Sequence, residues 1–430
     1  MINKQEVIKM ARENILPFWQ NMKDDEYGGF YGEADFYGKI DKTANKGGIL
    51  NSRILWTFSA AYKLFKDDYY KTCAVHAKEF LTSAFLDNEH GGVYWLVDNK
   101  GKPLQTRKQF YNIAFAIYAL SEYFLAVGDK SSLVTALSLF NVLEKYGFDP
   151  EYGGYIEARI REWNDIDDFR LSGKDLNSPK SMNTNLHVLE AYTTLLIACQ
   201  KANAGNSDAV AGEKHVKKAL QALLRVTLDK IVNSSRHFEL FFDMEWNSLS
   251  KEVSWGHDIE GSWLMYEAAL AIGDINLTNE VRQTAIAIAD KIHSVALGTS
   301  TETDHFKPEG QWSVEGSPLD YRNGELKNGG LLSGLTEDGN VLTKKEWWPQ
   351  SEAVIGFYNA YELTGEQKYS DAVNGIWEYI KNHFTDNTNG EWHNELDSNN
   401  IPDTKMPKAG FWKCPYHNAR MCFELIKRMN

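Results

Sequence analysis

The strongest constraint on the fold is a motif that recurs along the chain. "DDEYGGFYG" (24–32), "DNEHGGVYW" (87–95) and "DPEYGGYIE" (149–157) share an acidic turn, a glycine pair and an aromatic or β-branched strand. The glycine pairs begin at positions 28, 91 and 153, which gives steps of 63 and 62 residues. "NGEWHNELD" (389–397) is a weaker fourth copy and "SRHFELFFD" (235–243) a degenerate fifth. Such self-similarity indicates a fold built by repeating one supersecondary unit.

Between these copies the apolar residues recur at helical spacing, as in "ALSLFNVLEKYGF" and "VRQTAIAIADKIHSVAL". The pattern predicts about twelve helices. Their expected ranges are 4–22, 46–66, 69–86, 109–128, 130–146, 182–203, 213–230, 256–273, 277–297, 347–365, 367–384 and 414–428.

Every second helix opens with polar or aromatic groups and then becomes apolar on nearly all sides, as in "RKQFYNIAFAIYAL" and "SWGHDIEGSWLMYEA". Helices that are apolar all round are buried, whereas the intervening helices carry charge on one side, as surface helices do. Six buried helices alternating with six outer ones describe an all-α (α/α)6 barrel with short β-hairpins in its connecting loops. The inner helices would point the same way, so their N-terminal ends would meet at one mouth.

We expect residues 1–430 to form a single catalytic domain, because a ring of helical hairpins grows by closing on itself. The glycine-pair hairpins could lie at the end opposite the mouth or along its rim. One polar, glycine-rich segment, about 298–346, interrupts the alternation of inner and outer helices. A loop of this length in a compact domain is usually functional, and we expect it on the rim, where it could cover the mouth.

The charge balance excludes some partners. The chain has 46 Lys and Arg against 59 Asp and Glu, a formal net charge of −13. Nucleic acids and anionic membranes require surfaces rich in Lys and Arg, so we expect neither as a partner. The N-terminal segment lacks the apolar region of a signal peptide, and no later run approaches membrane-spanning length. The four cysteines are scattered without C-x-x-C spacing, which suggests a cytoplasmic protein; barrels of this kind occur as monomers or weak dimers.

The first turns of the six inner helices carry an unusual set of side chains. They are Arg53, Trp56, Tyr111, Asn112, Asn183, His187, His257, Glu260, Trp347, Trp348, Glu352, Trp412, Tyr416, His417 and Arg420. Indole faces stack on pyranose rings, Arg, Glu and Asn bind hydroxyls, and imidazoles exchange protons near neutral pH. An aromatic pocket with a few directed polar groups is typical of a ligand site, and here it predicts a small sugar as the ligand.

Each of these residues also has a purely structural interpretation. His187 alone could be a satisfied buried histidine. Arg53 on a buried helix needs partners, and Glu260 and Glu352 could supply them as a structural ion pair. The same bias at six independent helix starts favours a functional site. A metal is not expected, because His257 and Glu260 lack an H-E-x-x-H arrangement.

Several stretches spread over the whole chain resemble the N-acylglucosamine 2-epimerase superfamily. They are "NSRILW" (51–56), "GGVYW" (91–95), "YNIAFAIYAL" (111–120), "MNTNLHVLEAY" (182–192), "GHDIEGSWL" (256–264), "WWPQSEAVIGF" (347–357) and "WKCPYHNARMC" (412–422). The resemblance implies an (α/α)6 barrel and inversion at C2 of a reducing-end aldose without a cofactor. The members it most resembles act on the glucose or mannose unit of β-1,4-linked disaccharides such as cellobiose.

The resemblance also implies roles. His257 and His417 match two acid/base histidines, and His187 matches a histidine assigned to ring opening. Arg53, Tyr111, Asn183, Glu260, Trp348 and Trp412 match the substrate-contacting set, to which Trp347 and Glu352 are added from the same helix starts. The 298–346 loop is longer than in a typical member, so it bears on the outer sugar subsite.

The chemistry of epimerisation assigns three tasks. The C2 proton becomes acidic only after ring opening, for which His187 would move a proton between O1 and O5. Arg53 would stabilise the negative charge of the resulting cis-enediolate. His257 and His417 would then remove and return the C2 proton on opposite faces, and Glu260 would favour the imidazolium of His257, one turn away.

Other functions fit parts of the same pattern. A free mannose, glucose or N-acylglucosamine 2-epimerase, or an aldose–ketose isomerase, would use the same enediolate. An inverting glycoside hydrolase would use Glu260 and Glu352 as two carboxylates about 6.5–9.5 Å apart. A non-catalytic sugar-binding protein would need only the aromatic pocket, and it would leave the histidines without a task.

Overall fold

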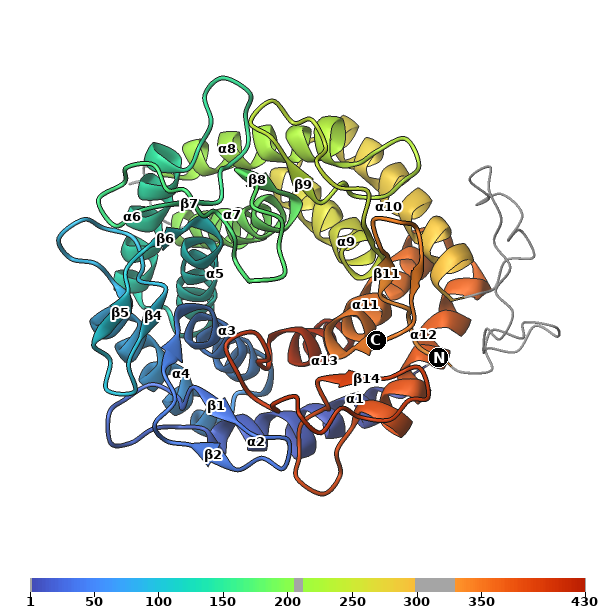
Figure 1. Cartoon of the computed structure of the whole chain (residues 1–430), viewed down its shortest axis with the longest axis horizontal. Coiled ribbons are helices and arrows are strands. Elements are labelled where there is room, and N and C mark those ends of the chain that lie inside the picture. Colours follow the sequence, from blue (N-terminus) through green and yellow to red (C-terminus); the bar gives the residue numbers. More distant parts are fainter. Residues whose placement is uncertain (1, 205–211, 298–328, 430) are drawn as a thin grey trace.

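The computed structural model describes residues 2–204, 212–297 and 329–429. Its helices form two concentric rings (Figure 1). The inner ring consists of α3 (Gly48–Phe65), α5 (Phe110–Val127), α7 (Met182–Asn203), α9 (Trp255–Ile272), α11 (Trp347–Thr364) and α13 (Tyr416–Arg428). Consecutive inner helices pack side by side, and α13 packs against α3, which closes the ring.

Outer helices alternate with these along the chain. They are α1 (Lys4–Lys9) continued by the π-helical turn η1 (Met10–Ile15) and α2 (Leu16–Asn21), α4 (Asp68–Phe80) with η2 (Leu81–Phe85), α6 (Lys130–Tyr146), α8 (Glu213–Val226) with η3 (Thr227–Ile231), α10 (Ile275–Ala296) and α12 (Gln367–Tyr379) with η5 (Ile380–Phe384). The (α/α)6 barrel is therefore confirmed, and each helix begins and ends within two residues of its predicted limits.

Tight turns join inner to outer helices at the end of the ring opposite the mouth. Gly128, Gly273 and Gly365 end inner helices with φ of 79°, 73° and 73°, a left-handed conformation that glycine adopts without strain. The next residue caps the following helix in two of these turns: Asp129 and Asp274 each accept a backbone N–H of its first turn. These short Gly-Asp turns explain why the paired helices are antiparallel.

The glycine-pair hairpins lie at the mouth, because each follows the C-terminal end of an outer helix and leads into the N-terminal end of an inner one. Five such hairpins are closed by single antiparallel bridges: Lys23–Phe30, Leu86–Val93, Phe148–Tyr155, Val232–Phe238 and Thr385–Trp392. The weaker copies at 235–243 and 389–397 are thus part of true repeats. Gly29 illustrates the need for glycine, since its φ is +67° and a Cβ there would lie 2.3 Å from Phe80.

Short strand pairs link each mouth loop to the next. The pairs are β3 (Lys46–Gly47) with β4 (Leu96–Val97), β6 (Lys108–Gln109) with β7 (Ala158–Arg159), β8 (Lys180–Ser181) with β9 (Phe241–Phe242), β10 (Val253–Ser254) with β11 (Gly334–Leu335) and β13 (Lys345–Glu346) with β14 (Glu395–Leu396). A bridge from Ala34 to Ala409 closes the circle. We call this circle of pairs the collar.

Three further strand pairs extend the mouth loops locally: β1 (Glu33–Ala34) pairs with β2 (Ile40–Asp41), β5 (Pro103–Gln105) with β4, and β12 (Val341–Leu342) with β11. Residues 298–328 of the predicted rim loop lie outside the described residues. The remainder of that loop supplies β11, β12 and β13 to the mouth.

Buried lysines of the collar form ion pairs with the hairpins. In four repeats a lysine at the collar donates Nζ to the aspartate that opens a glycine-pair hairpin. The pairs are Lys46–Asp24 (2.6 Å), Lys108–Asp87 (2.8 Å), Lys180–Asp149 (2.6 Å) and Lys408–Asp386. In the repeat before α9 both partners are replaced together, since Asn233 takes the place of the aspartate and Val253 that of the lysine. In these five repeats the lysine and its aspartate are therefore either both present or both replaced.

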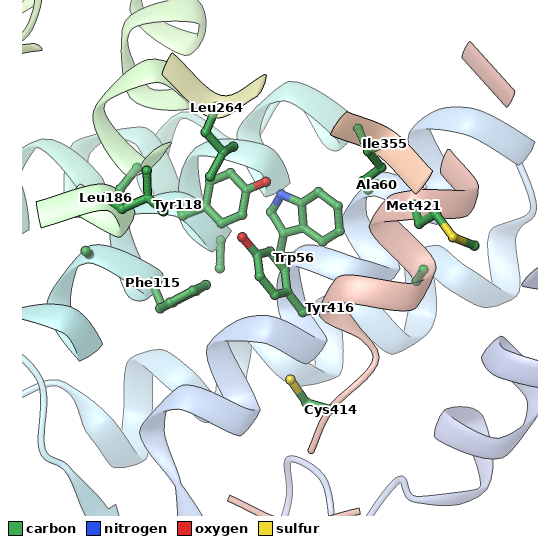
Figure 2. Close-up of a cluster of buried hydrophobic side chains, with 14 of the residues drawn as sticks. Trp56, Ala60, Phe115, Tyr118, Leu186, Leu264, Ile355, Cys414, Tyr416 and Met421 are labelled. Carbon is green, nitrogen blue, oxygen red and sulfur yellow. The ribbon is translucent and has the colours of Figure 1, made fainter. Parts of the chain in front are cut away.

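The centre of the ring is filled by side chains from all six inner helices (Figure 2). Trp56 stacks on Tyr118 with a centroid distance of 5.3 Å, and Tyr416 meets the Trp56 ring edge-on at 5.5 Å. Leu186, Leu264 and Ile355 pack around this aromatic group (Figure 2). Trp56, one turn below the mouth, belongs to this core rather than to the wall of the site.

Within the described part of the chain, one helix is long and apolar enough to cross a membrane, contrary to the sequence-based expectation. It is α5, with a mean hydropathy of 1.4, and 89% of it is buried inside the protein. Its apolar character is explained by its place in the inner ring, where neighbours cover it on all sides.

Candidate active site

Two imidazoles at the mouth lie against the same indole ring. The centroids of His257 and His417 are 4.7 and 5.6 Å from that of Trp348. Nδ1 of His257 lies 2.8 Å from Oγ of Ser254, and Nδ1 of His417 lies 2.7 Å from Oε1 of Glu352. Neither Nε2 makes a hydrogen bond to a described residue. Each ring is therefore fixed through one nitrogen and keeps the other for a ligand.

The third predicted histidine has the same arrangement. Nδ1 of His187, in the second turn of α7, lies 2.9 Å from Oε2 of Glu190. The His187 ring meets Tyr111 edge-on at 5.1 Å, and the Tyr111 hydroxyl accepts a hydrogen bond of 2.7 Å from Nη2 of Arg53. Tyr111 thus connects the candidate for ring opening with the cation expected to bind the enediolate.

Arg53 is only 3% exposed, yet it forms no ion pair with a described residue. Its guanidinium lies 4.2 Å from the ring centroid of Phe115 and 4.8 Å from that of Tyr416, and its Nε is buried without a hydrogen-bond partner. The structural ion pair considered for Glu260 and Glu352 is therefore wrong. A buried cation held by aromatic faces keeps its charge available for an anion.

The two glutamates pair with Arg420 instead. Nη2 of Arg420 lies 2.7 Å from Oε1 of both Glu260 and Glu352, and its Nη1 contacts Oε1 of Glu190. One oxygen or nitrogen atom each of Glu260, Glu352 and His417 lie within 4.8 Å of one another. Among the described residues, this is the group whose spacing most resembles a metal site. Arg420 supplies the positive charge at this point.

Burial controls the protonation of these groups. It lowers the pKa of His257 to about 3, with a smaller contribution from the charge of His187. Burial also lowers the pKa of His417 well below its usual value, and Arg53 and Arg420 act in the same direction. Both imidazoles therefore favour the neutral form at neutral pH, in which an imidazole can accept a proton.

Burial and the neighbouring Glu352 raise the pKa of Glu260 to about 7. The expectation that Glu260 favours the imidazolium of His257 is wrong, because Glu260 binds Arg420 and the partner of His257 is the uncharged Ser254. The nearest imidazole nitrogen to Glu260 is Nδ1 of His417, at 3.8 Å.

The predicted tryptophans differ in their depth of burial at the mouth. Trp412 is 36% exposed at the mouth and meets Tyr111 at 5.9 Å. Trp347 is 4% exposed and packs edge-on against His417 at 5.2 Å, with Nζ of Lys413 4.2 Å above its other side. Trp412 can therefore contact a ligand directly, whereas Trp347 supports His417 from behind.

A small pocket of about 70 Å³ adjoins His257 and Asn183. Its other wall is formed by residues 169–178 of the loop before β8, including Arg170 and Asp175. Oδ1 of Asn183 is buried without a hydrogen-bond partner. The structure thus places Asn183 where a sugar hydroxyl could bind.

Sequence reasoning missed two supporting residues, Glu190 and Ser254. Glu190 lies three residues after His187 in "HVLE", a spacing that places both on one helix face. Ser254 precedes the first turn of α9 and caps it, accepting the backbone N–H of His257. Both signals were present, but each is also common in helices without a site.

Comparisons with known proteins identify the family of the chain. The profile of the N-acylglucosamine 2-epimerase family matches residues 28–307 and 321–420. The chain is 41% identical over 429 residues to the cellobiose 2-epimerase of Bacteroides fragilis, covering 99% of both chains. It is 38% identical over 426 residues to that of Ruminococcus albus, covering 98% of both. The solved cellobiose 2-epimerase of Bacillus thermoamylovorans superposes with a TM-score of 0.85 at 36% identity, with 99% of each chain covered.

Fold and site together define an (α/α)6-barrel protein whose mouth holds three imidazoles, two arginines and stacked aromatic rings. The chain belongs to the N-acylglucosamine 2-epimerase family and is a carbohydrate epimerase.

Proposed function

We propose that this protein inverts C2 of the reducing-end glucose or mannose unit of β-1,4-linked disaccharides such as cellobiose. The relatives that match the chain along its whole length are cellobiose 2-epimerases. The observation that carries the proposal is the placement of His257 and His417 against Trp348, each fixed at Nδ1 and with Nε2 unused. A sugar ring bound beside this indole would lie next to both imidazoles.

The reaction begins with ring opening. Nε2 of His187 takes the proton of O1 and returns one to O5 while the C1–O5 bond breaks, which leaves an aldehyde at C1. One imidazole then removes the C2 proton to give a cis-enediolate, whose negative oxygen is stabilised by Arg53. The other imidazole delivers a proton to C2 from the opposite face, and the ring closes again.

The charges suggest where the mobile proton resides before reaction. His257 is hydrogen-bonded to a neutral hydroxyl, and burial and His187 lower its pKa to about 3, so the ring is neutral at neutral pH and its free nitrogen can accept a proton. His417 is hydrogen-bonded to Glu352, whose pKa burial raises. We infer that Nδ1 of His417 and the carboxylate of Glu352 share one proton, so that Nε2 of His417 can act as the acid. In the reverse direction His257 and His417 exchange the roles of base and acid.

The geometry disfavours an inverting glycoside hydrolase. Ligand oxygens of Glu260 and Glu352 lie within 4.8 Å, which is less than the ~6.5–9.5 Å needed to place a water between two carboxylates. Both Oε1 atoms are also bound to Arg420. These carboxylates orient Arg420 and His417 rather than flank a bond.

The test is isotope exchange during turnover. Cellobiose incubated with the protein in deuterated water should give the C2 epimer with deuterium at C2, and His257→Asn should abolish the label. The matched control is His215→Asn on outer helix α8, whose side chain is 57% exposed. Unlabelled epimer, or glucose as the product, would overturn the proposal. A ketose with label would favour the isomerase alternative, and faster turnover of free mannose would favour a monosaccharide epimerase.

We further propose that the chain works as a single catalytic domain in the cytoplasm, as a monomer or weak dimer. The four cysteines are all buried and unpaired, which suits a reducing compartment. Sedimentation at micromolar concentration should give a mass between those of one and two chains. A stable larger assembly would contradict this proposal.

A further inference from the structure

Glu190 is the carboxylate nearest to His187, and both side chains are deeply buried. They project from one face of α7, three residues apart, and are 3% and 4% exposed. The contact from Nδ1 to Oε2 is 2.9 Å long. Because both residues lie in the second and third turns of a 22-residue helix, their relative position is set by the backbone.

Glu190 also contacts two residues of α13, on the opposite side of the ring. The hydroxyl of Tyr416 donates to both oxygens of its carboxylate at 2.5 Å, and Nη1 of Arg420 contacts Oε1. Burial alone would raise the pKa of Glu190, but Arg420 and His187 hold it at about 2. Glu190 is therefore ionised. An ionised carboxylate can only accept a hydrogen bond, so Nδ1 of His187 must be the donor.

This hydrogen bond determines which nitrogen of His187 is free. With Nδ1 donating to Glu190, the lone pair of neutral imidazole resides on Nε2, which makes no hydrogen bond to a described residue. A carboxylate at Nδ1 also stabilises the imidazolium that forms when Nε2 takes a proton. Neither His257 nor His417 has a carboxylate of lowered pKa at Nδ1, since His257 faces the hydroxyl of Ser254 and His417 faces Glu352, whose pKa is raised by burial.

We propose that Glu190 is the positioning residue of ring opening, which it serves by orienting His187 through Nδ1. The inference rests on the proposed function in one respect: it takes the substrate to be a closed pyranose. In the step, Nε2 of His187 accepts the proton of O1, the C1–O5 electron pair moves onto O5, C1 becomes an aldehyde, and the same proton passes to O5. Glu190 stabilises the transient imidazolium and touches no substrate atom.

A substrate that has no ring to open tests this role. In 4-O-β-glucosyl-5,6-dideoxyglucose the reducing unit lacks O5 and O6 and its O4 is glycosylated, so it stays an open aldehyde. For Glu190→Gln we expect kcat on cellobiose to fall roughly 100-fold or more, whereas kcat on the open analogue should change less than threefold. Equal losses on both substrates would overturn the proposal, because a general structural role would slow both.

A double-mutant cycle checks that Glu190 acts through His187. In a His187→Ala background, Glu190→Gln should cause little further loss on cellobiose, since the residue it positions is gone. Additive losses would contradict the proposal. If Glu190→Gln does not fold, Glu190→Asp is compared on the same two substrates, because the shorter carboxylate cannot reach Nδ1 and should give the same selective loss.

Anomer interconversion separates this inference from the proposed function. Exchange between α- and β-cellobiose, followed by NMR, requires ring opening but no chemistry at C2. If the wild-type protein speeds this exchange without labelling C2, and Glu190→Gln slows it, the epimerase proposal fails and the role of Glu190 stands. If C2 is labelled but Glu190→Gln leaves anomer exchange unchanged, the role of Glu190 is wrong.

Discussion

His257 is held by Ser254 and by no carboxylate of the described residues: its Nδ1 lies 2.8 Å from the Ser254 Oγ. The same hydroxyl caps α9 by accepting the backbone N–H of His257 at 3.4 Å. One serine therefore sets both the start of the helix and the orientation of the ring. A neutral partner also leaves the imidazole uncharged, consistent with its lowered pKa.

The first prediction concerns this hydroxyl. Ser254→Ala should lower kcat for cellobiose epimerisation about tenfold, because the ring of His257 loses its fixed orientation, and should cost about 1 kcal/mol of stability from the lost cap. Ser254→Thr should retain most activity. Steady-state kinetics and thermal unfolding check both effects. Ser262→Ala on the same helix, which loses only a hydrogen bond to the Ile259 carbonyl, is the control, and a comparable fall in its kcat would contradict the assignment.

The second prediction concerns the carboxylate at His417. Glu352→Gln replaces the carboxylate at Nδ1 with an amide that cannot share a proton, so kcat should fall roughly 100-fold or more with KM changed much less. Glu362→Gln lies on the same helix and pairs with Arg428 far from the mouth, and it should keep wild-type kinetics. A variant at Glu352 within threefold of wild type would exclude the proposed acid.

The third prediction concerns pH and stability at Glu157, a buried collar-side residue whose Oε1 has no hydrogen-bond partner. Burial raises its pKa from 4.5 to about 7. The folded protein therefore holds this proton more tightly than the unfolded chain. Its stabilising contribution is fully present below pH 4.5 and is lost as pH rises through about 7.

Glu157→Gln removes this titration while keeping an acceptor for the Thr184 hydroxyl. Above pH 7 the variant should exceed the wild type in unfolding free energy by up to about 3 kcal/mol, and the difference should shrink as the pH falls from about 7 to 4.5. Urea unfolding between pH 4.5 and 8.5 measures this. A pH-independent difference would refute the assignment. The exposed Glu13→Gln should show no such trend.

The fourth prediction concerns the buried pairs of the collar. Lys180→Val leaves the carboxylate of Asp149 buried without its cation and should destabilise the protein by roughly 3–5 kcal/mol. Adding Asp149→Asn should recover much of this loss, because the repeat before α9 carries Val253 and Asn233 at these two places. Denaturant unfolding of single and double variants tests the coupling, and a double variant less stable than the single one would contradict it.

Much of the fold could be predicted because it depends on local patterns. The all-round apolar helices, such as 109–128, differ from one-sided ones, and this difference assigned each helix to the inner or outer ring. The helix starts then indicated which side chains meet, including His187, His257 and His417. These are properties of periodicity and position that a single chain displays without knowledge of its packing.

The sequence did not predict which charged side chains contact one another. Arg53 and Arg420 both begin inner helices and both look able to bind Glu260 and Glu352, but only Arg420 does. Likewise, Glu260 is one turn from His257 yet lies 3.8 Å from Nδ1 of His417, on α13, two inner helices further along the ring. Such choices depend on the distance across the barrel, which is set when α13 packs against α3 and α11.

The amino-acid sequence by itself determined the repeat, the number and alternation of helices, and the residue types brought to the mouth, because each of these follows from local composition and spacing. The tertiary structure alone decided which nitrogen of each histidine is free, which carboxylates are ionised, and which arginine keeps its charge unpaired. Those properties arise from burial and from contacts between helices far apart in the chain, since hydrogen bonds and pKa values depend on the neighbours that folding supplies.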